Sequence, residues 1–463
     1  MCKREEARFR EKVEEIRQSI DEGGLPFANL LSVELVHKVL ERCKVSFRER
    51  IYTPWTTLCV FLTQLLSADH SCAHAVCNLI AWLTSRNQEP CSPNTGSYCT
   101  ARSRLPENFY EELMRQTGKG LSDQTPEVWL WKGRNVKVVD GTTASMPDTE
   151  ENQAEYPQSD QQAPGLGFPL VRIVVLFSLA VGTVLERAVG PYKGKKTGEI
   201  SLFRTLEDRL EPGDVLLADR YYCTYAEIAE LRRNHVDLVV KLHQARDCDF
   251  SQGRRLGKND HIVTWTKPRQ CPPGLDREVF KRLPKTMEVR EVKVAVQQKG
   301  FRVKCFVVVT TLLDADQYSS EEIAELYRRR WMSELYLRDI KITLQMDILR
   351  CESPEMIRKE ILVHLLAYNL VRIQMAQAAL CSGQHPHQIS FKGALQAIEA
   401  FRDRFVCVRD THAQAVLVAT IAYRQVGNRP DRCEPRAIKR RPKPHRLLTE
   451  PRDQARKCLD KYA

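Results

Sequence analysis

The sequence predicts a mixed α/β fold that follows an all-helical region and is interrupted by a β-rich insertion. Three observations lead to this prediction. Apolar residues recur every three or four positions in much of the first third of the chain. Short β-branched runs replace that pattern after Trp131. Helix-like and strand-like segments then alternate up to about residue 245, as they do in α/β sheets.

Length and composition indicate a folded protein with several domains and a polyanionic partner. A chain of 463 residues exceeds the size at which one hydrophobic core keeps growing, so we expect two or three domains. Hydrophobic residues at 43% and charged residues at 28% exclude a largely disordered chain. Lys and Arg outnumber Asp and Glu by 71 to 59, which favours nucleic acid as the partner.

Neither the start of the chain nor its most apolar stretch indicates export or a membrane. The first residues are charged and have no apolar core, so they do not form a secretory signal. The stretch from Trp55 to Trp82 is interrupted by Gln64 and Asp69, which predicts a buried pair of helices. We therefore expect a cytoplasmic protein with no membrane partner.

The sixteen cysteines form no CxxC pair, and in a reducing compartment we expect them to be free thiols. One group could suggest zinc, but its spacing matches no common structural zinc site. We interpret it as side chains on packed helices; it consists of His70, Cys72, His74 and Cys77.

Changes in pattern divide the chain into five segments. These are a helical N-terminal region (1–130), a first core part (131–245), a β-rich insertion (246–305), a second core part (306–385), and a C-terminal helical region with a basic tail (386–463). Within the second core part, helix is expected from Ser319 to about Leu380.

Two aspartates end apolar strands. Asp140 closes VKVVD before Gly141, and Asp219 closes DVLLAD before Arg220. Since α/β enzymes place working groups at strand ends, these two carboxylates are candidates to converge.

A charged helix face supplies the third acid. At about 100° per residue, Tyr327, Arg330, Glu334 and Lys341 fall within a sector of roughly 60°. Phosphodiester cleavage is well served by two divalent cations about 4 Å apart, and Asp and Glu are the natural ligands of magnesium or manganese. Asp140, Asp219 and Glu334 are therefore the candidate catalytic and metal-binding residues.

The same residues carry a resemblance to a known family. The spacing Tyr327, Arg330, Glu334 and Lys341 matches without a gap the signature of the DDE transposases of the insertion sequence 4 family. The blocks VVDGTTASMPDTEENQAEYPQ and GDVLLADRYYCTYAEI resemble the family's first and second aspartate regions. The resemblance covers most of the chain. Glu199 also matches the family pattern, without a role that we can assign.

The resemblance implies an RNase H-like catalytic core and cut-and-paste transposition of a bacterial insertion sequence. Such an enzyme binds the terminal inverted repeats, nicks DNA at the transposon end, and joins the freed 3′-hydroxyl to target DNA. The implied cofactor is Mg²⁺, with Mn²⁺ able to substitute. The implied partners are double-stranded DNA and a second copy of the chain in a synaptic complex, associated with the nucleoid when DNA is bound.

The resemblance also implies DNA contacts. Tyr327, Arg330 and Lys341 would meet phosphates near the cleaved end, in keeping with the bidentate geometry of arginine on phosphate. Trp265 would stack on a flipped base, and a core tryptophan is an equal alternative.

Basic segments add further candidate contacts. Lys195 and Lys196 lie in a basic loop that could bind phosphate or simply be solvated. By charge, position and family analogy, the helical N-terminal region (1–130) is the expected DNA-binding region for the inverted repeats. The basic tail could add backbone affinity through Lys439, Arg440 and Arg441.

Three alternatives remain at this point: a nuclease of the same fold that cleaves without strand transfer, a DNA-binding relic without catalysis, and a zinc-dependent enzyme that uses the cysteines.

Overall fold

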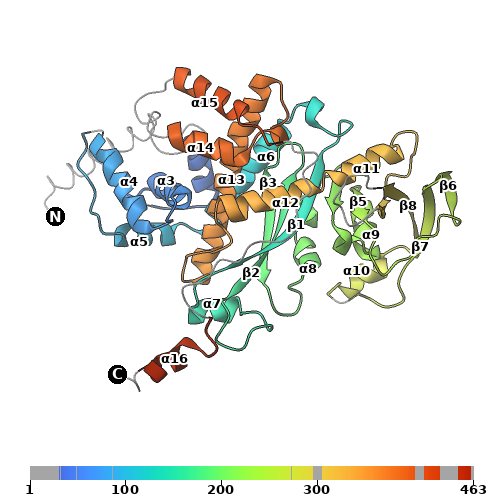
Figure 1. Ribbon diagram of the computed structural model, residues 1–463, viewed down its shortest axis with the longest axis horizontal. Coiled ribbons are helices and arrows are strands. Elements are labelled where there is room, and N and C mark those ends of the chain that lie inside the picture. The colour runs from blue at the N-terminus through green and yellow to red at the C-terminus, as the bar shows by residue number, and fades with distance from the viewer. Residues whose placement is uncertain are drawn as a thin grey trace.

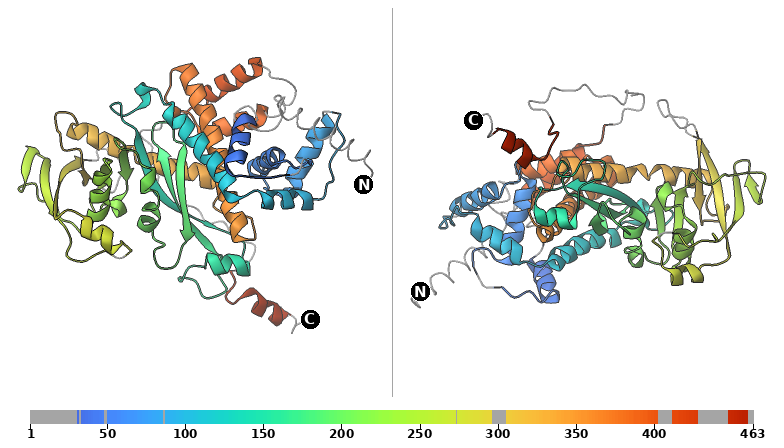
Figure 2. Two further views of the ribbon diagram at one scale, coloured as in Figure 1. Left: turned by 180° about the vertical axis from the view of Figure 1, so that it is seen from behind. Right: turned by 90° about the horizontal axis from the view of Figure 1, so that it is seen from below.

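The computed structural model describes residues 31, 33–47, 50–85, 87–272, 274–295, 305–401, 411–427 and 447–459. A central sheet separates a group of helices from a smaller, mostly β region (Figure 1). Figure 2 shows the same arrangement from behind and from below. The prediction of an α/β fold that follows a helical region in the sequence is therefore confirmed. The sheet positions the candidate catalytic residues.

The chain enters the sheet from a run of helices. Helices α2 (Val33–Arg42), α3 (Pro54–Leu66), α4 (Cys72–Ser85), α5 (Gly96–Arg104) and α6 (Glu107–Asp123) precede every described strand. Helix α3 begins at Pro54, where the Thr53 side chain caps the N–H of Thr56. Since α3 and α4 divide the apolar stretch, the predicted buried helical pair is confirmed. No helix in the described part of the chain has the length and apolarity needed to cross a bilayer.

The core sheet alternates with short helices. Its elements are β1 (Val136–Ser145), α7 (Glu150–Glu155), β2 (Leu170–Ser178), β3 (Val184–Pro191), α8 (Glu199–Phe203), β4 (Val215–Ala218), α9 (Tyr225–Arg233) and β5 (Asp237–Lys241). Strands β1, β2 and β3 pair antiparallel, while β4 runs parallel to β1 and β5 runs parallel to β4. The order β3-β2-β1-β4-β5 is that of an RNase H-like core, as expected.

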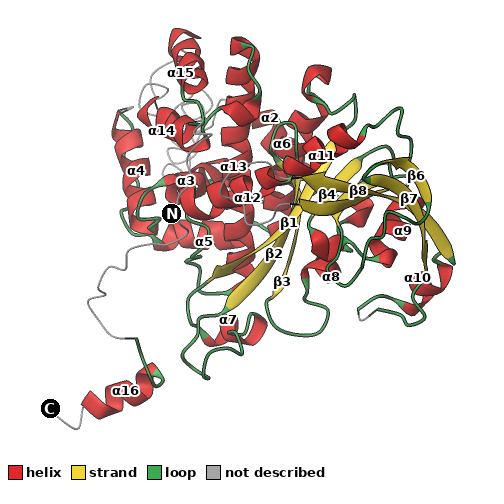
Figure 3. Cartoon of the chain, turned by 45° about the vertical axis from the view of Figure 1, so that its right-hand side comes forward, coloured by secondary structure: helices red, strands yellow, loops and turns green. Residues whose placement is uncertain are grey.

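The β-rich insertion extends this sheet. It contains β6 (Arg254–Gly257), β7 (Asp260–Thr266), α10 (Arg277–Arg282) and β8 (Thr286–Ala295), followed by β9 (Cys305–Thr310). Strand β9 pairs antiparallel with β5 on one side and with β8 on the other. The nine described strands thus form one continuous layer, drawn yellow in Figure 3.

The remaining elements are helical. They are α11 (Ser320–Arg328), α12 (Trp331–Arg338), a π-helical turn (Asp339–Thr343), α13 (Pro354–Ser382), α14 (Phe391–Phe401), α15 (Thr411–Tyr423) and α16 (Arg452–Leu459). A capping box between Ser319 and Glu322 fixes the start of α11. The expectation of one helical stretch from Ser319 to Leu380 is wrong, because the helix is broken at Arg329 and Arg330 and again after Thr343.

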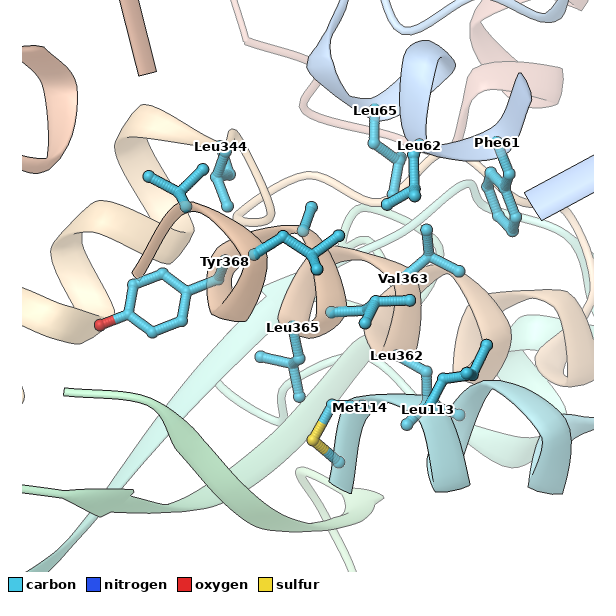
Figure 4. Close-up of a cluster of buried hydrophobic side chains, with 14 of the residues drawn as sticks. Phe61, Leu62, Leu65, Leu113, Met114, Leu344, Leu362, Val363, Leu365 and Tyr368 are labelled. Carbon is cyan, nitrogen blue, oxygen red and sulfur yellow. The ribbon is translucent and has the colours of Figure 1, made fainter. Parts of the chain in front are cut away.

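Helices from both ends of the chain share one hydrophobic core. Helix α13 is buried along most of its length and packs against α3, α6, α14 and α15. Figure 4 shows this core, whose labelled side chains are Phe61, Leu62, Leu65, Leu113, Met114, Leu344, Leu362, Val363, Leu365 and Tyr368. We call α2–α6 together with α12–α15 the helical body. The segments predicted as separate N-terminal and C-terminal regions meet in it.

A buried amide ties the helical body to the sheet. Asn369 on α13 donates to the carbonyls of Met114 and Val184, both at 3.0 Å, and accepts from the Val184 N–H at 2.8 Å. Helix α6 approaches β3 so closely that a methyl group at Gly118 would lie 1.9 Å from the Val184 oxygen. Three elements distant in sequence are thereby fixed together.

The variant Asn369→Ala should be destabilised by about 2–4 kcal/mol, since it removes the Asn369 partner of the buried Val184 N–H and carbonyl, while the Met114 carbonyl keeps its bond from the Thr117 hydroxyl. Gln377→Ala, at an exposed amide on the same helix, is the control and should cost less than about 0.5 kcal/mol. Urea unfolding of both variants measures the difference. Equal midpoints would contradict the role assigned to Asn369.

Candidate active site

Asp140 and Asp219 occupy matching positions on neighbouring parallel strands. The register pairs Val138 of β1 with Leu217 of β4, and two further residues along each strand lead to the two aspartates. Adjacent strands lie about 4.8 Å apart, so both carboxylates reach the same edge of the sheet. Asp219 comes directly after β4 and accepts a hydrogen bond from the Arg220 N–H.

Glu334 reaches this edge from α12, which crosses β1 (Figure 1). The preceding residue, Ser333, is fully buried and donates its hydroxyl to Asp140 Oδ2 at 2.7 Å. One turn later the Tyr336 hydroxyl donates to the Leu179 carbonyl at 3.3 Å. These two contacts fix the rotation of α12 relative to β1, and they turn Glu334 toward Asp140.

Arg330 lies between the carboxylates. Its Nη1 is 3.7 Å from Asp140 Oδ2, and its Nη2 forms an ion pair with Glu334. The arginine side chain is only 16% exposed, so solvent screens these contacts weakly. The guanidinium thus supplies positive charge where two acids meet.

These groups line an open cleft of about 430 Å³, which we call the active cleft. Its lining consists of Asp140, Gly141, Asp219, Arg330, Glu334, Leu337, Arg338, Lys341 and Ile342. Five of the predicted residues are thereby brought together, although they come from three separate parts of the chain. Carboxylates and cations in one cleft suit a metal-dependent reaction on a phosphodiester.

Tyr327 does not line the active cleft. The expected single helix face is interrupted, because the Arg330 N–H bonds to the Tyr327 carbonyl three residues back. The Tyr327 ring is buried and packs 5.3 Å from the ring of Phe306. Burial raises the pKa of its hydroxyl, while nearby Arg330 lowers it. Tyr327 therefore packs behind Arg330.

A fourth carboxyl group adjoins the active cleft. Glu199, at the start of α8, lies so close to β1 that a methyl group at Gly141 would come within 2.5 Å of its Cδ atom. A larger residue at position 141 would require the Glu199 side chain to move away from β1. Burial raises the pKa of Glu199, the neighbouring charges of Asp140 and Asp219 raise it further, and Arg172 opposes them.

The pKa of Asp140 is also raised. Burial raises the pKa of the Asp140 carboxyl, whereas the Ser333 hydrogen bond and the charge of Arg330 lower it. The Tyr222 hydroxyl is buried among the acids and makes no hydrogen bond within the described residues. The acids of the site thus carry more negative charge than the neighbouring cations, Arg330 and Arg172, neutralise.

The other predicted DNA contacts lie outside the active cleft. Trp265 is 7% exposed, donates to Glu291 at 3.1 Å and is covered by the Arg246 guanidinium, which fits the core alternative. Lys195 and Lys196 are exposed in the loop before α8. The tail residues Lys439, Arg440 and Arg441 fall outside the described part of the chain.

Comparison with known proteins agrees with this geometry. A family model described as "Transposase DDE domain" matches residues 131–370, a range that contains all three acids. The chain belongs to the DDE transposase family. It is therefore an enzyme that cleaves and joins DNA in transposition and uses divalent metal ions.

Curated relatives narrow the family further. The transposase resembles the "Transposase InsG for insertion sequence element IS4" of Escherichia coli (strain K12), with 29% identity over 326 residues that cover 69% of each chain. It also resembles the "Putative transposase InsL for insertion sequence element IS186A" of the same strain, with 37% identity over 76 residues, or 16% of this chain and 20% of the relative. It is thus a homologue of insertion sequence 4 family transposases.

A solved structure resembles the transposase in outline. This is a piggyBac transposase in a synaptic complex with hairpin DNA, with a TM-score of 0.44 and 9% identity. The match covers 85% of this chain and 84% of the other.

Three residues in or beside the transposase's active cleft received no role from the sequence. Ser333 directly precedes Glu334 but is not one of the signature residues, so the spacing pattern gives no indication of its bond to Asp140. Glu199 matched a family pattern, but only the structure brings it against Gly141. Arg338 lines the cleft four residues after Glu334, and helical spacing from that acid could have indicated it.

The raised pKa of Glu199 predicts a pH-dependent stability. A carboxyl whose pKa is higher in the folded state favours folding most below its unfolded pKa of about 4.3, and that advantage is lost as pH rises through the folded pKa. Without divalent metal, Glu199→Gln should therefore melt above the wild type near neutral pH, and the gap should shrink toward about pH 4. Thermal unfolding across pH measures the gap, and a gap independent of pH would refute the assignment.

Proposed function

We propose that this transposase moves a bacterial insertion sequence by a cut-and-paste reaction. It would bind the terminal inverted repeats, cut DNA at the transposon end and join the freed 3′-hydroxyl to target DNA, within the bacterial cytoplasm. The observation that supports this most is the active cleft, where Asp140, Asp219 and Glu334 lie with Arg330 and Lys341. Acids to hold metal and cations to hold phosphate are the two components that the reaction needs.

Mg²⁺ is the cofactor that the donor set fits best, with Mn²⁺ as a substitute. The three acids offer hard oxygen ligands, which these ions prefer, and no Cys, His or Met is among the described residues that line the cleft. The partly uncompensated negative charge around Asp140 and Glu199 also favours a divalent cation. When bound, such ions activate the attacking oxygen and stabilise the leaving oxygen of the phosphodiester.

The chain's own residues would position the ligands and the DNA. Ser333 holds Asp140 at the cleft through its hydroxyl. Arg330 pairs with Asp140 and Glu334. If those carboxylates held metal, the Arg330 guanidinium would be available to bind phosphate oxygens. Lys341 and Arg338 line the same cleft and add charge for the DNA backbone.

The helical N-terminal region is the part that we assign to recognition of the inverted repeats. It carries a second cleft, of about 520 Å³, whose lining includes Arg50, Arg104 and the exposed Phe47. Lys195, Lys196 and the basic tail would add contacts to the DNA backbone that do not depend on sequence. Because two transposon ends must be processed together, we infer a homodimer with one active cleft for each end.

Replacing any of the three acids should abolish cleavage and preserve DNA binding. Asp140→Asn, Asp219→Asn and Glu334→Gln each remove a metal ligand, and a loss of several kcal/mol in transition-state stabilisation corresponds to a rate decrease of about 10³ or more. Nicking of a labelled duplex that carries the element's terminal repeat measures the rate, and a gel-shift assay measures binding.

Glu321→Gln is the matched control, because Glu321 is an exposed acid in the first turn of α11 and is not among the residues that line the active cleft. This variant should cut at the wild-type rate. Full activity in Asp140→Asn, Asp219→Asn or Glu334→Gln would refute the assignment of that residue.

Strand transfer separates a transposase from a nuclease. With a pre-cut end that carries a free 3′-hydroxyl, Mg²⁺ should support joining to a supercoiled plasmid. An otherwise identical end with a 3′-deoxy terminus should not join, because the attacking oxygen is missing. Ca²⁺ should support binding with little joining, since its looser coordination positions the reacting oxygens poorly. Fragment release without any joined product would contradict transposition by this route.

A further inference from the structure

Three potential metal ligands meet in the β-rich insertion, away from the active cleft. Cys248 lies in the loop between β5 and β6, His261 lies on β7, and Glu291 lies on β8 directly opposite His261. One ligand atom of each residue lies within 4.8 Å of the others. The imidazole and the carboxylate are almost fully buried, with exposures of 1% and 3%, while Cys248 is partly exposed.

The distances suit a tetrahedral metal. His261 Nε2 is 3.0 Å from Glu291 Oε2 and 3.7 Å from Cys248 Sγ. Zinc bonds of about 2.0–2.3 Å at tetrahedral angles put neighbouring ligand atoms roughly 3.3–3.7 Å apart. The two pairs that involve His261 are already close to these separations, and all three ligand atoms lie within 4.8 Å of one another, so small side-chain rotations would bring the three donors onto one ion.

The hydrogen bonding of His261 requires either a proton or a metal ion between Nε2 and Glu291. The other ring nitrogen, Nδ1, lies 2.8 Å from the Gln252 carbonyl, which accepts its proton. In a neutral ring Nε2 then carries a lone pair, and that lone pair faces a carboxylate oxygen. Either a proton or a metal ion must stand between the two atoms. The Cys248 thiol also lies next to His261 Nε2, and this favours a metal ion at that nitrogen. In a Cys–His catalytic pair, by contrast, the thiol and the orienting carboxylate contact different ring nitrogens.

Outer contacts fix the orientation of the ligands. The Gln252 carbonyl sets the tautomer of His261, and the Trp265 Nε1 donates to Glu291 Oε1 at 3.1 Å, which leaves Oε2 for the cluster. Metal-binding histidines and carboxylates commonly have such second partners. The Phe250 ring lies 4.5 Å from the imidazole and shields one side.

We propose that Cys248, His261 and Glu291 bind a zinc ion, with water as the fourth ligand on the partly exposed cysteine side. A thiolate and an imidazole favour zinc over magnesium, so this site differs in kind from the three-acid site in the active cleft. The assignment does not depend on the proposed transposition reaction.

The ion would fasten a loop that leads from the core to the insertion. Residues 242–253 connect β5 to β6, and Gln244 in this loop accepts a hydrogen bond from Arg220, the residue after Asp219. Zinc would tie this loop to β7 and β8 through Cys248. It would thereby hold the insertion in place beside the active cleft.

Metal analysis of the full chain tests the proposal. Untagged protein dialysed in excess Mg²⁺ should retain about one zinc per chain, and Cys248→Ser should lose most of it. Cys271→Ser is the matched control, because Cys271 is also a partly buried thiol of the insertion, but among the described residues its Sγ is bonded to the carbonyls of Pro272 and Leu275 and belongs to no group of potential metal ligands. This control should keep its zinc.

Wild-type protein alone provides the second measurement, which does not require any variant to fold. Chelation should expose Cys248 to alkylation, whereas added zinc should protect it and leave the alkylation of Cys271 unchanged, as read by peptide mass spectrometry. Co²⁺ in place of zinc should add thiolate charge-transfer absorption. Wild-type protein that holds no zinc, or alkylation of Cys248 that zinc does not change, would overturn the proposal.

Discussion

The crowding of like charges at one edge of a buried sheet is the constraint on which the rest of the structure depends. Asp140, Asp219, Glu334 and Glu199 adjoin one another, and burial raises the pKa of the first and the last. Two like charges about 4 Å apart repel by about 4 kcal/mol at an effective dielectric constant of 20. Arg330 offsets part of this repulsion, and bound divalent cations would offset the remainder.

Acids that repel one another stay close together only where the surrounding structure holds them rigidly. Two arrangements do so here. Parallel pairing of β1 with β4 sets the two aspartates side by side, and the Ser333 hydroxyl fixes α12 against β1. Behind them the helical body is held by the buried α13 and by Asn369, which bonds to both α6 and β3. The N-terminal helices therefore belong to the same packed unit as the helices after Glu334. DNA bound by one part would be presented to the other in a fixed geometry.

The fold class and the convergence of the three acids in one cleft could be predicted from sequence because local patterns encode them, while the catalytic role of these acids stays a prediction. Strand ends mark Asp140 and Asp219, and gap-free spacing marks Glu334. The break at Arg329 and Arg330, which buries Tyr327, could not be predicted, because helical periodicity continues through it and only packing against Phe306 reveals it. The continuity of the sheet could not be predicted from the sequence either, because the pairing of β9 with β5 and β8 depends on contacts distant in sequence.

Metal-directed cleavage of the polypeptide tests most directly whether the three acids hold common metal ions. Fe²⁺ can replace Mg²⁺ at oxygen-ligand sites, and with peroxide and ascorbate it generates hydroxyl radicals that cut the nearby backbone. The structure predicts cuts close to residues 140, 219 and 334 together, all suppressed by excess Mg²⁺ and all weakened in Asp219→Asn. Cuts confined to one of these segments, or cuts that Mg²⁺ does not suppress, would contradict a shared metal site in the active cleft.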